Sequence, residues 1–304
     1  MIENSSFTGS ITGTELSAFG GIAGHNQPRG VIRHVTMSGD VNGSHIGGVA
    51  VFNHNRGEIS HIQVSGNVSG SDASGVVFGN FGNISSVEVS GSISGNFASG
   101  VASGNNGEIN GAKVSGNVYG FNRAGGVAQR NYDSGVIKNV RVSAYVTGGR
   151  GAAGIVDINS GGTVEYAIVS GLVRGTILFS AGVVCINSAV TQGRVVHQPV
   201  VQNTVVISPF IHGRLGSTRI FAYLHSGAFR NQNQGTLRNN HAYAAMRSCG
   251  YLVTNGTHNN YQGQNVDGET LATIEFWRDA VGFDFVNAWQ WCDDANLPVL
   301  RFLQ

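Results

Sequence analysis

Two consecutive stretches decide the fold: residues 58–82 read EISHIQVSGNVSGSDASGVVFGNFG, and residues 83–107 read NISSVEVSGSISGNFASGVASGNNG. They align without a gap, and aliphatic residues recur at the same places in both. Aliphatic and other residues alternate with a period of two, which is the pattern of short β-strands that bury one face. The sequence therefore predicts a repeated unit made of short strands.

The same unit recurs through most of the chain, in seven imperfect copies of 25 to 31 residues. Its aliphatic columns are mostly β-branched, the type that packs well on a pleated surface. The copies start at Met1, Val31, Glu58, Asn83, Glu108, Val136 and Thr163, and an eroded eighth starts at Arg194. The second column reads Ile2, Ile32, Ile59, Ile84, Ile109, Ile137, Val164 and Val195.

One unit alone cannot bury its apolar face, whereas stacked units can, because each strand pairs with its copy about 4.8 Å away in the next unit. We therefore expect an all-β fold, a parallel β-helix (solenoid) of about seven to eight rungs. Parallel crossover connections strongly prefer one hand, which predicts a right-handed coil.

Glycine and polar columns mark the corners of the predicted rungs. The glycine that ends the second strand of each unit, such as Gly70 and Gly95, is expected to adopt a positive φ. A serine column that includes Ser65 and Ser90, and an asparagine column, are expected to form hydrogen-bonded ladders from rung to rung. We assign the asparagine column to Asn26, Asn55, Asn80, Asn105, Asn131 and Asn159.

The composition argues against several classes of function. The net charge is +1 with no cluster of Lys or Arg, so nucleic-acid binding is not expected. No apolar run approaches the roughly 20 residues that a membrane helix needs, so membrane insertion is not expected. The cysteines Cys185, Cys249 and Cys292 lack metal-ligand spacing, and we expect neither a metal nor a cofactor. Cys249 and Cys292 either pair or remain buried thiols.

Motifs within the repeats resemble a known family. GGIAGHN at residues 20–26, GVI at 30–32 and MSGDVNG at 37–43 are similar to the GLUG motif, which runs roughly G-G-L-V-G-x-N-x-G-x-I-x-x-S-x-x-x-G-x-V-x-G. Residues 75–95 and 100–120 fit nearly as well. Near the end, FW at 276–277, GFDF at 282–285, Trp289 and PVLR at 298–301 resemble the family's closing pattern G-W-D-F-x-x-x-W…P-x-L.

The GLUG motif occurs in bacterial surface and secreted repeat proteins, including adhesins and the non-catalytic regions of IgA-specific zinc metallopeptidases. The resemblance implies a right-handed β-helix and an extracellular or cell-surface location, but no single activity. The sequence has no HExxH zinc-protease motif, so the resemblance does not carry peptidase activity to this chain.

The repeat pattern divides the chain into three parts: regular repeats over 1–193, an irregular continuation over 194–262, and a C-terminal cap over 263–304. Within the cap, a short helix is expected from Glu269, capped by Thr270 or Thr273. All three tryptophans lie in this part, and we expect them to form an aromatic plug over the last rung. Because Ile2 already occupies an inward column, the N-terminal end is expected to continue into, or pack on, another domain or subunit.

Charged residues offer little catalytic chemistry. Asp133 and Asp157 are expected in third-turn loops of successive rungs, and they are the nearest approach to a carboxylate pair. His34 and His61 share a column in adjacent rungs and are expected to stack about 5 Å apart. We therefore assign no catalytic residue.

The leading hypothesis is a non-catalytic structural or adhesive module that binds a host protein, a glycan or another cell-surface ligand. Variable loops are the expected contact sites, and the candidate ligand-binding residues are Phe121, Asn122, Arg123, Tyr132, Asp133 and Asp157. The alternative is a glycan-cleaving β-helix, such as a polysaccharide lyase or a tailspike-like depolymerase, which requires convergent carboxylates in a groove.

Overall fold

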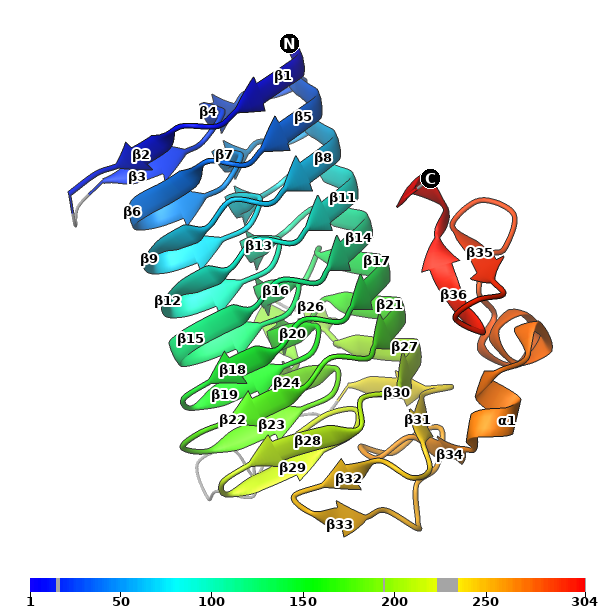
Figure 1. Ribbon diagram of the computed structural model, residues 1–304. Coiled ribbons are helices and arrows are strands. Elements are labelled where there is room, and N and C mark those ends of the chain that lie inside the picture. The colour runs from blue at the N-terminus through cyan, green and yellow to red at the C-terminus, as the bar shows by residue number, and fades with distance from the viewer. Residues whose placement is uncertain (15–16, 194, 223–234, 304) are drawn as a thin grey trace.

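The computed structural model describes residues 1–14, 17–193, 195–222 and 235–303. The chain winds into a β-solenoid of about nine turns, in which three parallel sheets form the sides (Figure 1). The expectation of seven to eight rungs was too low, because the irregular region adds further strands to the stack.

The first sheet contains one strand from almost every rung, paired in parallel with its neighbours. Its strands are β1 Ile2–Phe7, β5 Val31–Met37, β8 Glu58–Val64, β11 Asn83–Val89, β14 Glu108–Val114, β17 Val136–Val142, β21 Thr163–Val169, β27 Val200–Val206, β30 Thr236–Arg238, β31 His241–Tyr243 and β34 Gln264–Val266. Their register aligns the columns that the repeat predicts, as in Ile59 beside Ile84 and Ile84 beside Ile109.

The second sheet follows the first along each rung, and its strands are partly split by a bend. They are β2 Ser10–Thr12, β3 Ala18–Gly20, β6 Asp40–Gly47, β9 Val68–Ser74, β12 Ile93–Ser99, β15 Val118–Gly125, β18 Val146–Gly148, β19 Gly151–Ala153, β22 Val173–Gly175, β23 Phe179–Ala181, β28 Phe210–Gly213, β29 Gly216–Thr218, β32 Arg247–Ser248 and β33 Tyr251–Leu252. The last two pair antiparallel, which ends the regular stacking in this sheet.

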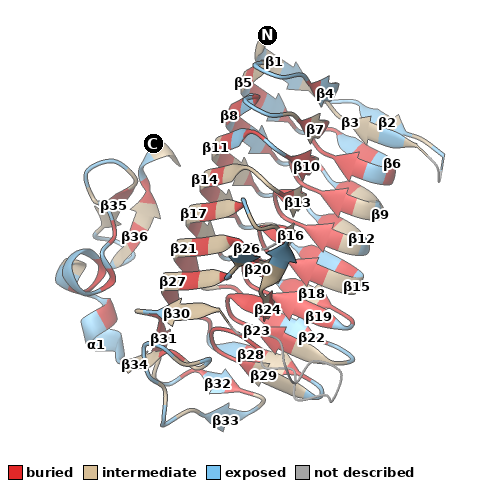
Figure 2. Cartoon of the chain, turned by 180° about the vertical axis from the view of Figure 1, so that it is seen from behind, coloured by how far each residue is buried: buried red, intermediate tan, exposed pale blue. Residues whose placement is uncertain are grey.

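The third sheet closes each of the rungs from β4 to β24. Its strands are β4 Ala23–Asn26, β7 Ala50–Asn53, β10 Val77–Asn80, β13 Ala102–Asn105, β16 Ala128–Asn131, β20 Val156–Ser160 and β24 Val184–Ser188. All three sheets contribute small or β-branched side chains to one continuous core; in a single rung Val87, Ala98 and Val101 are fully buried (Figure 2). Each fully buried valine of this kind contributes about 1.5–3 kcal/mol.

A ladder of buried asparagines runs along the corner after the third sheet. Each side-chain amide donates to the amide oxygen of the next rung at 2.8–3.0 Å. The members are Asn26, Asn53, Asn80, Asn105, Asn131, Asn159 and Asn187. The predicted ladder is confirmed, but Asn53 rather than the exposed Asn55 is its second member. The serines act differently, because Ser90 donates to the carbonyl of Val64 in the rung before, not to another serine.

The corner glycines are required for close approach and not for a positive φ. Gly70 and Gly95 have no positive φ, so that prediction was wrong. A Cβ atom on Gly95 would lie 2.3 Å from the carbonyl oxygen of Gly70, a distance that excludes any side chain. Left-handed residues recur instead in the fourth column of the first sheet, where His34, His61 and Ser86 have φ of 53°, 53° and 54°. The register of the ladder skips this position in each rung.

The eighth rung is offset from its predicted register. Thr163 pairs with Val200 and Val164 with Val201, so Val201, not Val195, occupies the second column. The inserted antiparallel pair β25 Val190–Gln192 and β26 Val195–His197 causes the offset, because it lengthens the preceding turn. Arg194, the predicted start of this unit, lies outside the described residues, as do positions 223–234 of the irregular continuation.

The closing segment, defined here as residues 267–303, contains the expected short helix but does not sit over the last rung. It comprises α1 Gly268–Leu271, a π-helix Phe276–Val281, strands β35 Trp289–Cys292 and β36 Leu297–Leu300, and a 3₁₀ turn Arg301–Leu303. It folds back along the outer face of the first sheet, beside β14 to β27 (Figures 1 and 2). Asp267, rather than Thr270 or Thr273, caps α1 by accepting from the Thr270 N–H at 2.7 Å.

An aromatic cluster attaches this segment to the sheet. Trp277 and Trp289 are fully buried and pack with Phe283, whose ring centroid lies 4.6 Å from that of Trp289. Outward-facing Ile168 and Val205 of the first sheet complete the cluster. The expected aromatic element is therefore present as a lateral cover, because apolar residues on this outer face supply the partner surface.

Candidate functional site

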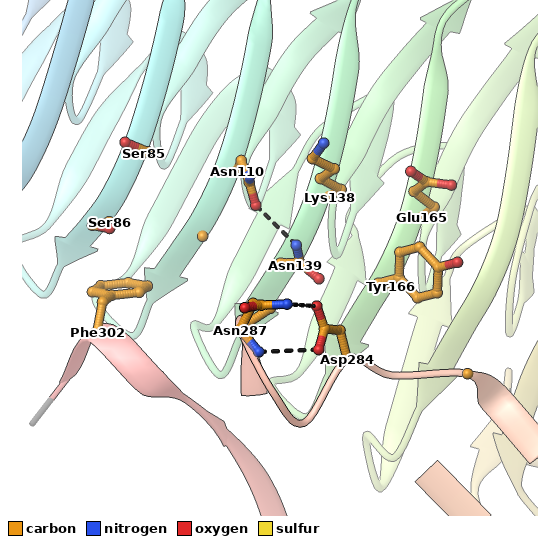
Figure 3. Close-up of a pocket in the computed structure, with 13 residues that line it drawn as sticks. Ser85, Ser86, Asn110, Lys138, Asn139, Glu165, Tyr166, Asp284, Asn287 and Phe302 are labelled. Carbon is orange, nitrogen blue, oxygen red and sulfur yellow. Dashed lines mark hydrogen bonds between the residues drawn. The ribbon is translucent and has the colours of Figure 1, made fainter. Parts of the chain in front are cut away.

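A polar groove separates the closing segment from the outer face of the first sheet. Its larger part is a cleft of about 550 Å³ between β11–β21 and the segment (Figure 3). A second hollow of about 390 Å³ adjoins it toward the N-terminal rungs, and both are lined by Ser86 and Phe302. The groove thus follows the stacking direction from the rung of His34 to that of Tyr166.

The floor of the larger cleft consists of the third and fourth columns of the first sheet, and in the smaller hollow the sixth column, including Glu88, also contributes. The third column presents Ser85, Asn110, Lys138 and Glu165 in successive rungs, each paired in register with the next. The fourth column presents side chains from left-handed positions, among them Asn139 and Tyr166 with φ of 51° and 50°. Gly111 leaves a gap in that column, and the Phe302 ring occupies the space outside it.

Floor charges are neutralised from rung to rung. Lys138 contacts Glu108 at 3.1 Å, and Lys113 contacts Glu88 at 2.7 Å. Glu165 accepts a hydrogen bond from Gln202 at 2.8 Å. These partners leave hydroxyl, amide and partly engaged carboxylate groups facing the groove, a set that suits a ligand rich in hydroxyl groups.

The closing segment forms the wall of the groove, and specific hydrogen bonds attach this wall to the floor. The Trp289 indole N–H donates to Asn139 Oδ1 at 3.0 Å, and Asn139 in turn donates to Asn110 at 2.8 Å. Arg141 donates to the carbonyl of Pro298 at 2.9 Å, and burial lowers the pKa of this guanidinium from its usual value. The wall therefore has one defined position relative to the columns.

Asp284 is the acidic residue of the wall that faces the groove. Hydrogen bonds from the Asn287 side chain, and then from the backbone N–H groups of Asn287 and Val286, lower the pKa of its carboxyl group (Figure 3). A carboxyl group with a lowered pKa stays ionised at neutral pH. It is therefore unsuited to the general-acid role in glycoside cleavage, which requires a raised pKa.

The predicted ligand-binding residues lie on other faces. Phe121 is exposed at the tip of a bend in β15, with 71% of its surface accessible, whereas Asn122 has a buried Oδ1 without a partner. Arg123 forms an ion pair with Asp157 at 3.0 Å. The structure brings these two together, but inside a corner rather than on a binding surface.

Asp157 and Asp133 do not form a carboxylate pair. Asp157 lies in β20 and is fully buried, so its assignment to a loop was wrong. Burial raises its pKa, against the opposing effect of Arg123. The Asp133 carboxylate lies 3.8 Å from the His197 ring nitrogen. The neighbouring Tyr132 ring packs under the Arg130 guanidinium, which lies 5.8 Å from the ring centroid. Each acid thus has its own basic partner.

The histidine and cysteine predictions have mixed outcomes. His34 and His61 stack with ring centroids 4.7 Å apart, as expected, and both line the smaller hollow of the groove. All three cysteines are free; Cys185 is buried, whereas Cys249 and Cys292 are partly exposed. Among the described residues, no three His, Cys, Asp or Glu side chains converge as ligands of a metal ion would. The residues that the structure describes also contain no helix that is long and apolar enough to cross a membrane.

Sequence reasoning missed the groove because its two sides are far apart in the chain. The columns of the floor follow from the repeat, but nothing in the repeat places Trp289 against Asn139. One signal was available: the third and fourth columns vary from rung to rung while their neighbours stay aliphatic. Such variation is typical of an outer face that is free of packing constraints.

No family model matches the chain, and no curated protein matches it in sequence. Among solved structures, it is similar to a candidate immunoglobulin A1 protease from Bacteroides ovatus, with a TM-score of 0.59 and 16% sequence identity. The similarity covers 91% of this chain and 88% of that chain. At this level of identity the similarity shows a shared solenoid fold over nearly the whole of both chains.

Proposed function

We propose that this chain is a non-catalytic binding module of a bacterial surface or secreted protein, and that it holds an extended glycan in the groove beside the first sheet. The observation that carries the proposal is the repetition of the floor. Polar side chains recur at the rung spacing of about 4.8 Å, and a regular spacing of this kind suits an extended ligand made of repeating units. Successive sugars can therefore each meet a polar side chain of the third column, although the residue type changes from rung to rung.

Aromatic side chains support the same ligand class. Tyr166 lines the groove on the floor, and Phe302 lines both of its hollows. Sugar rings have an apolar face that stacks on such rings while their hydroxyl groups bond to amides and carboxylates. The floor offers Asn110 and Glu165 for those bonds.

The GLUG-like motifs and the solenoid fold shared with the Bacteroides ovatus protein support the surface or secreted location. Proteins of this shape present long sides rather than a single deep cavity, which suits recognition of extended ligands. Host or bacterial cell-surface glycans are the partners that such a location makes accessible.

Glycan cleavage is the alternative, because Glu165 on the floor and Asp284 on the wall line the same cleft. Two carboxylates across a bound sugar are the basic requirement of glycoside hydrolysis. Because Asp284 stays ionised, it suits only the base or nucleophile role, and Glu165 would have to be the proton donor. Glu165 already accepts a hydrogen bond from Gln202, which favours binding over catalysis.

A glycan array followed by calorimetry tests the proposal. We expect the intact chain to bind one class of oligosaccharide, and Tyr166→Ala or Phe302→Ala to weaken that binding about tenfold or more. Tyr119→Ala is the matched control, because Tyr119 is equally aromatic and half exposed but lies on the second sheet. Turnover of the bound oligosaccharide that disappears in Glu165→Gln would establish the enzymatic alternative instead.

A further inference from the structure

A separate trough lies on the third sheet and at its border with the second sheet, on a different side of the solenoid from the groove. Its volume is about 320 Å³, and it crosses β7, β10, β13 and β16, whose strands Figure 2 shows from behind. None of its lining residues belongs to the groove described above.

The floor of the trough is made by two glycines in one column. Phe52, Gly79, Gly104 and Arg130 pair in register in four successive rungs. Neither glycine has a positive φ, so the backbone conformation does not demand them. A Cβ atom on Gly79 would lie 2.7 Å from the Phe52 ring, and one on Gly104 would lie 3.2 Å from the Tyr132 ring. The two glycines therefore leave a gap between the large side chains at either end.

Aromatic rings enclose this gap. Phe52 and Phe81 stand at one end with ring centroids 6.5 Å apart, and Phe78 packs edge-on against Phe52 at 5.7 Å. Tyr132 stands at the other end. Phe81 keeps 42% of its surface exposed even though it neighbours other aromatic rings. A flat ligand with an apolar face fits between such walls.

Arg130 supplies a cation at one end of the trough, and its charge, together with that of Arg123, opposes the burial that raises the pKa of Asp157. Its guanidinium lies over the Tyr132 ring at 5.8 Å, and its Nε is buried with no hydrogen-bond partner. Two acids lie nearby: Asp72 lines the trough itself and contacts His45 at 3.2 Å, and the buried Asp157 accepts a hydrogen bond from Arg123. Within the described residues Arg130 forms no ion pair. A buried donor with no partner is costly unless a ligand satisfies it.

We propose that the trough binds a carboxylated pyranose, with the carboxylate on Arg130 and the apolar face of the ring against Tyr132 and Phe81 over the glycine floor. An arginine offers the planar, charge-assisted pair of donors that a carboxylate accepts. Uronic acids and sialic acids share this chemistry. The site is independent of the groove, so either can fail without the other.

Ligand-observed NMR on the intact chain, with glucuronate, N-acetylneuraminate and glucose as probes, tests this site. We expect at least one of the two acids to bind and neutral glucose to bind about tenfold or more weakly, because it lacks the charged partner of Arg130. Whichever acid binds identifies the source of the carboxylate. Binding of neither acid, or of glucose equally well, would overturn the proposal.

Two variants locate the binding. Arg130→Gln is expected to weaken the acid about tenfold or more, whereas Arg150→Gln, at an exposed arginine elsewhere, leaves it unchanged. Gly104→Ala places a single methyl group on the floor, 3.2 Å from the Tyr132 ring, and is expected to weaken binding; a melting temperature close to that of the wild type would show that the strand, which has no positive φ here, is intact. Acid binding that survives both substitutions would contradict the assignment. Tyr166→Ala in the groove serves as the cross-check and should leave this site intact.

Discussion

The trunk, residues 31–193, and the closing segment, residues 267–303, are built on different principles. In the trunk every rung repeats the contacts of its neighbours through parallel ladders, an aliphatic core and a column of asparagines. The closing segment has one antiparallel hairpin, short helical turns and one aromatic cluster. Its attachment depends on a few large side chains, whereas the trunk distributes its stabilisation over many small ones.

This difference bears on the groove between them. The floor belongs to a stack in which each rung is held from both sides, so its columns keep a fixed spacing. The wall belongs to a segment whose attachment depends on the Trp277, Phe283 and Trp289 cluster and on hydrogen bonds such as that from Trp289 to Asn139. Substitutions in each part should therefore act locally and to different extents.

The largest expected effect is Trp289→Ala. Removing this fully buried ring should cost about 5 kcal/mol, at the upper end for an aromatic truncation, because Asn139 also loses its donor. Limited proteolysis should release the closing segment while the trunk resists. Trp291→Ala, at a partly exposed ring in the same strand, is the control. Cooperative loss of the trunk together with the segment would contradict this separation.

Asn53→Ala tests the trunk in the same way. It leaves the amides of Asn26 and Asn80 without one partner each inside the corner, and should cost about 3–4 kcal/mol. Chemical denaturation measures the change, and Asn55→Ala, exposed in the same turn, should cost under about 0.5 kcal/mol. Equal costs for the two variants would argue against the ladder register.

Acid should loosen the irregular region and the closing segment before the trunk. Burial, and then the charge of His258, lower the pKa of His241 to about 4, and its ring packs on Phe276 at 5.1 Å. Because the unfolded pKa is about 6.5, the unfolded state binds more protons between these values. The contribution of His241 to the free energy of unfolding is therefore fully present above pH 6.5. It decreases by about 3 kcal/mol as the pH falls toward 4. Thermal melts across this range should show the slope in the wild type and a smaller one in His241→Asn.

The smallest expected effect is at the Glu88–Lys113 pair. Both side chains remain partly exposed, so a double-mutant cycle with Glu88→Ala and Lys113→Ala should give a coupling under about 1 kcal/mol. A coupling of several kcal/mol would mean that the floor depends on its charges rather than on its ladders.

Most of the trunk could be predicted from the sequence, because every rung repeats one local problem. Columns such as Ile59, Ile84 and Ile109 identify the inward face and its register directly. The asparagine ladder was misplaced at one rung, since Asn53 and Asn55 are equivalent by composition and differ only in the direction of their side chains. The right hand of the coil stays a prediction from the crossover preference.

The position of the closing segment could not be predicted in the same way. Its contacts join residues such as Asn139 and Trp289 that share no periodic relation. The outward-facing Ile168 of the first sheet gave a local hint, because it replaces the charged Lys113 and Arg141 of the same column. The eighth rung was misplaced because the inserted β25–β26 hairpin imitates the Val-rich repeat pattern. Periodicity identifies a register only while the repeat is unbroken.

Amide hydrogen exchange followed by mass spectrometry tests the central claim most directly, namely that a rigid stack carries a separately docked wall. We predict that peptides from β8 to β21 exchange slowest, and that the closing segment exchanges faster and as one unit. In Trp289→Ala only the closing segment should lose its protection. A wall as slow to exchange as the stack, or a stack that loses protection with the wall, would contradict the account.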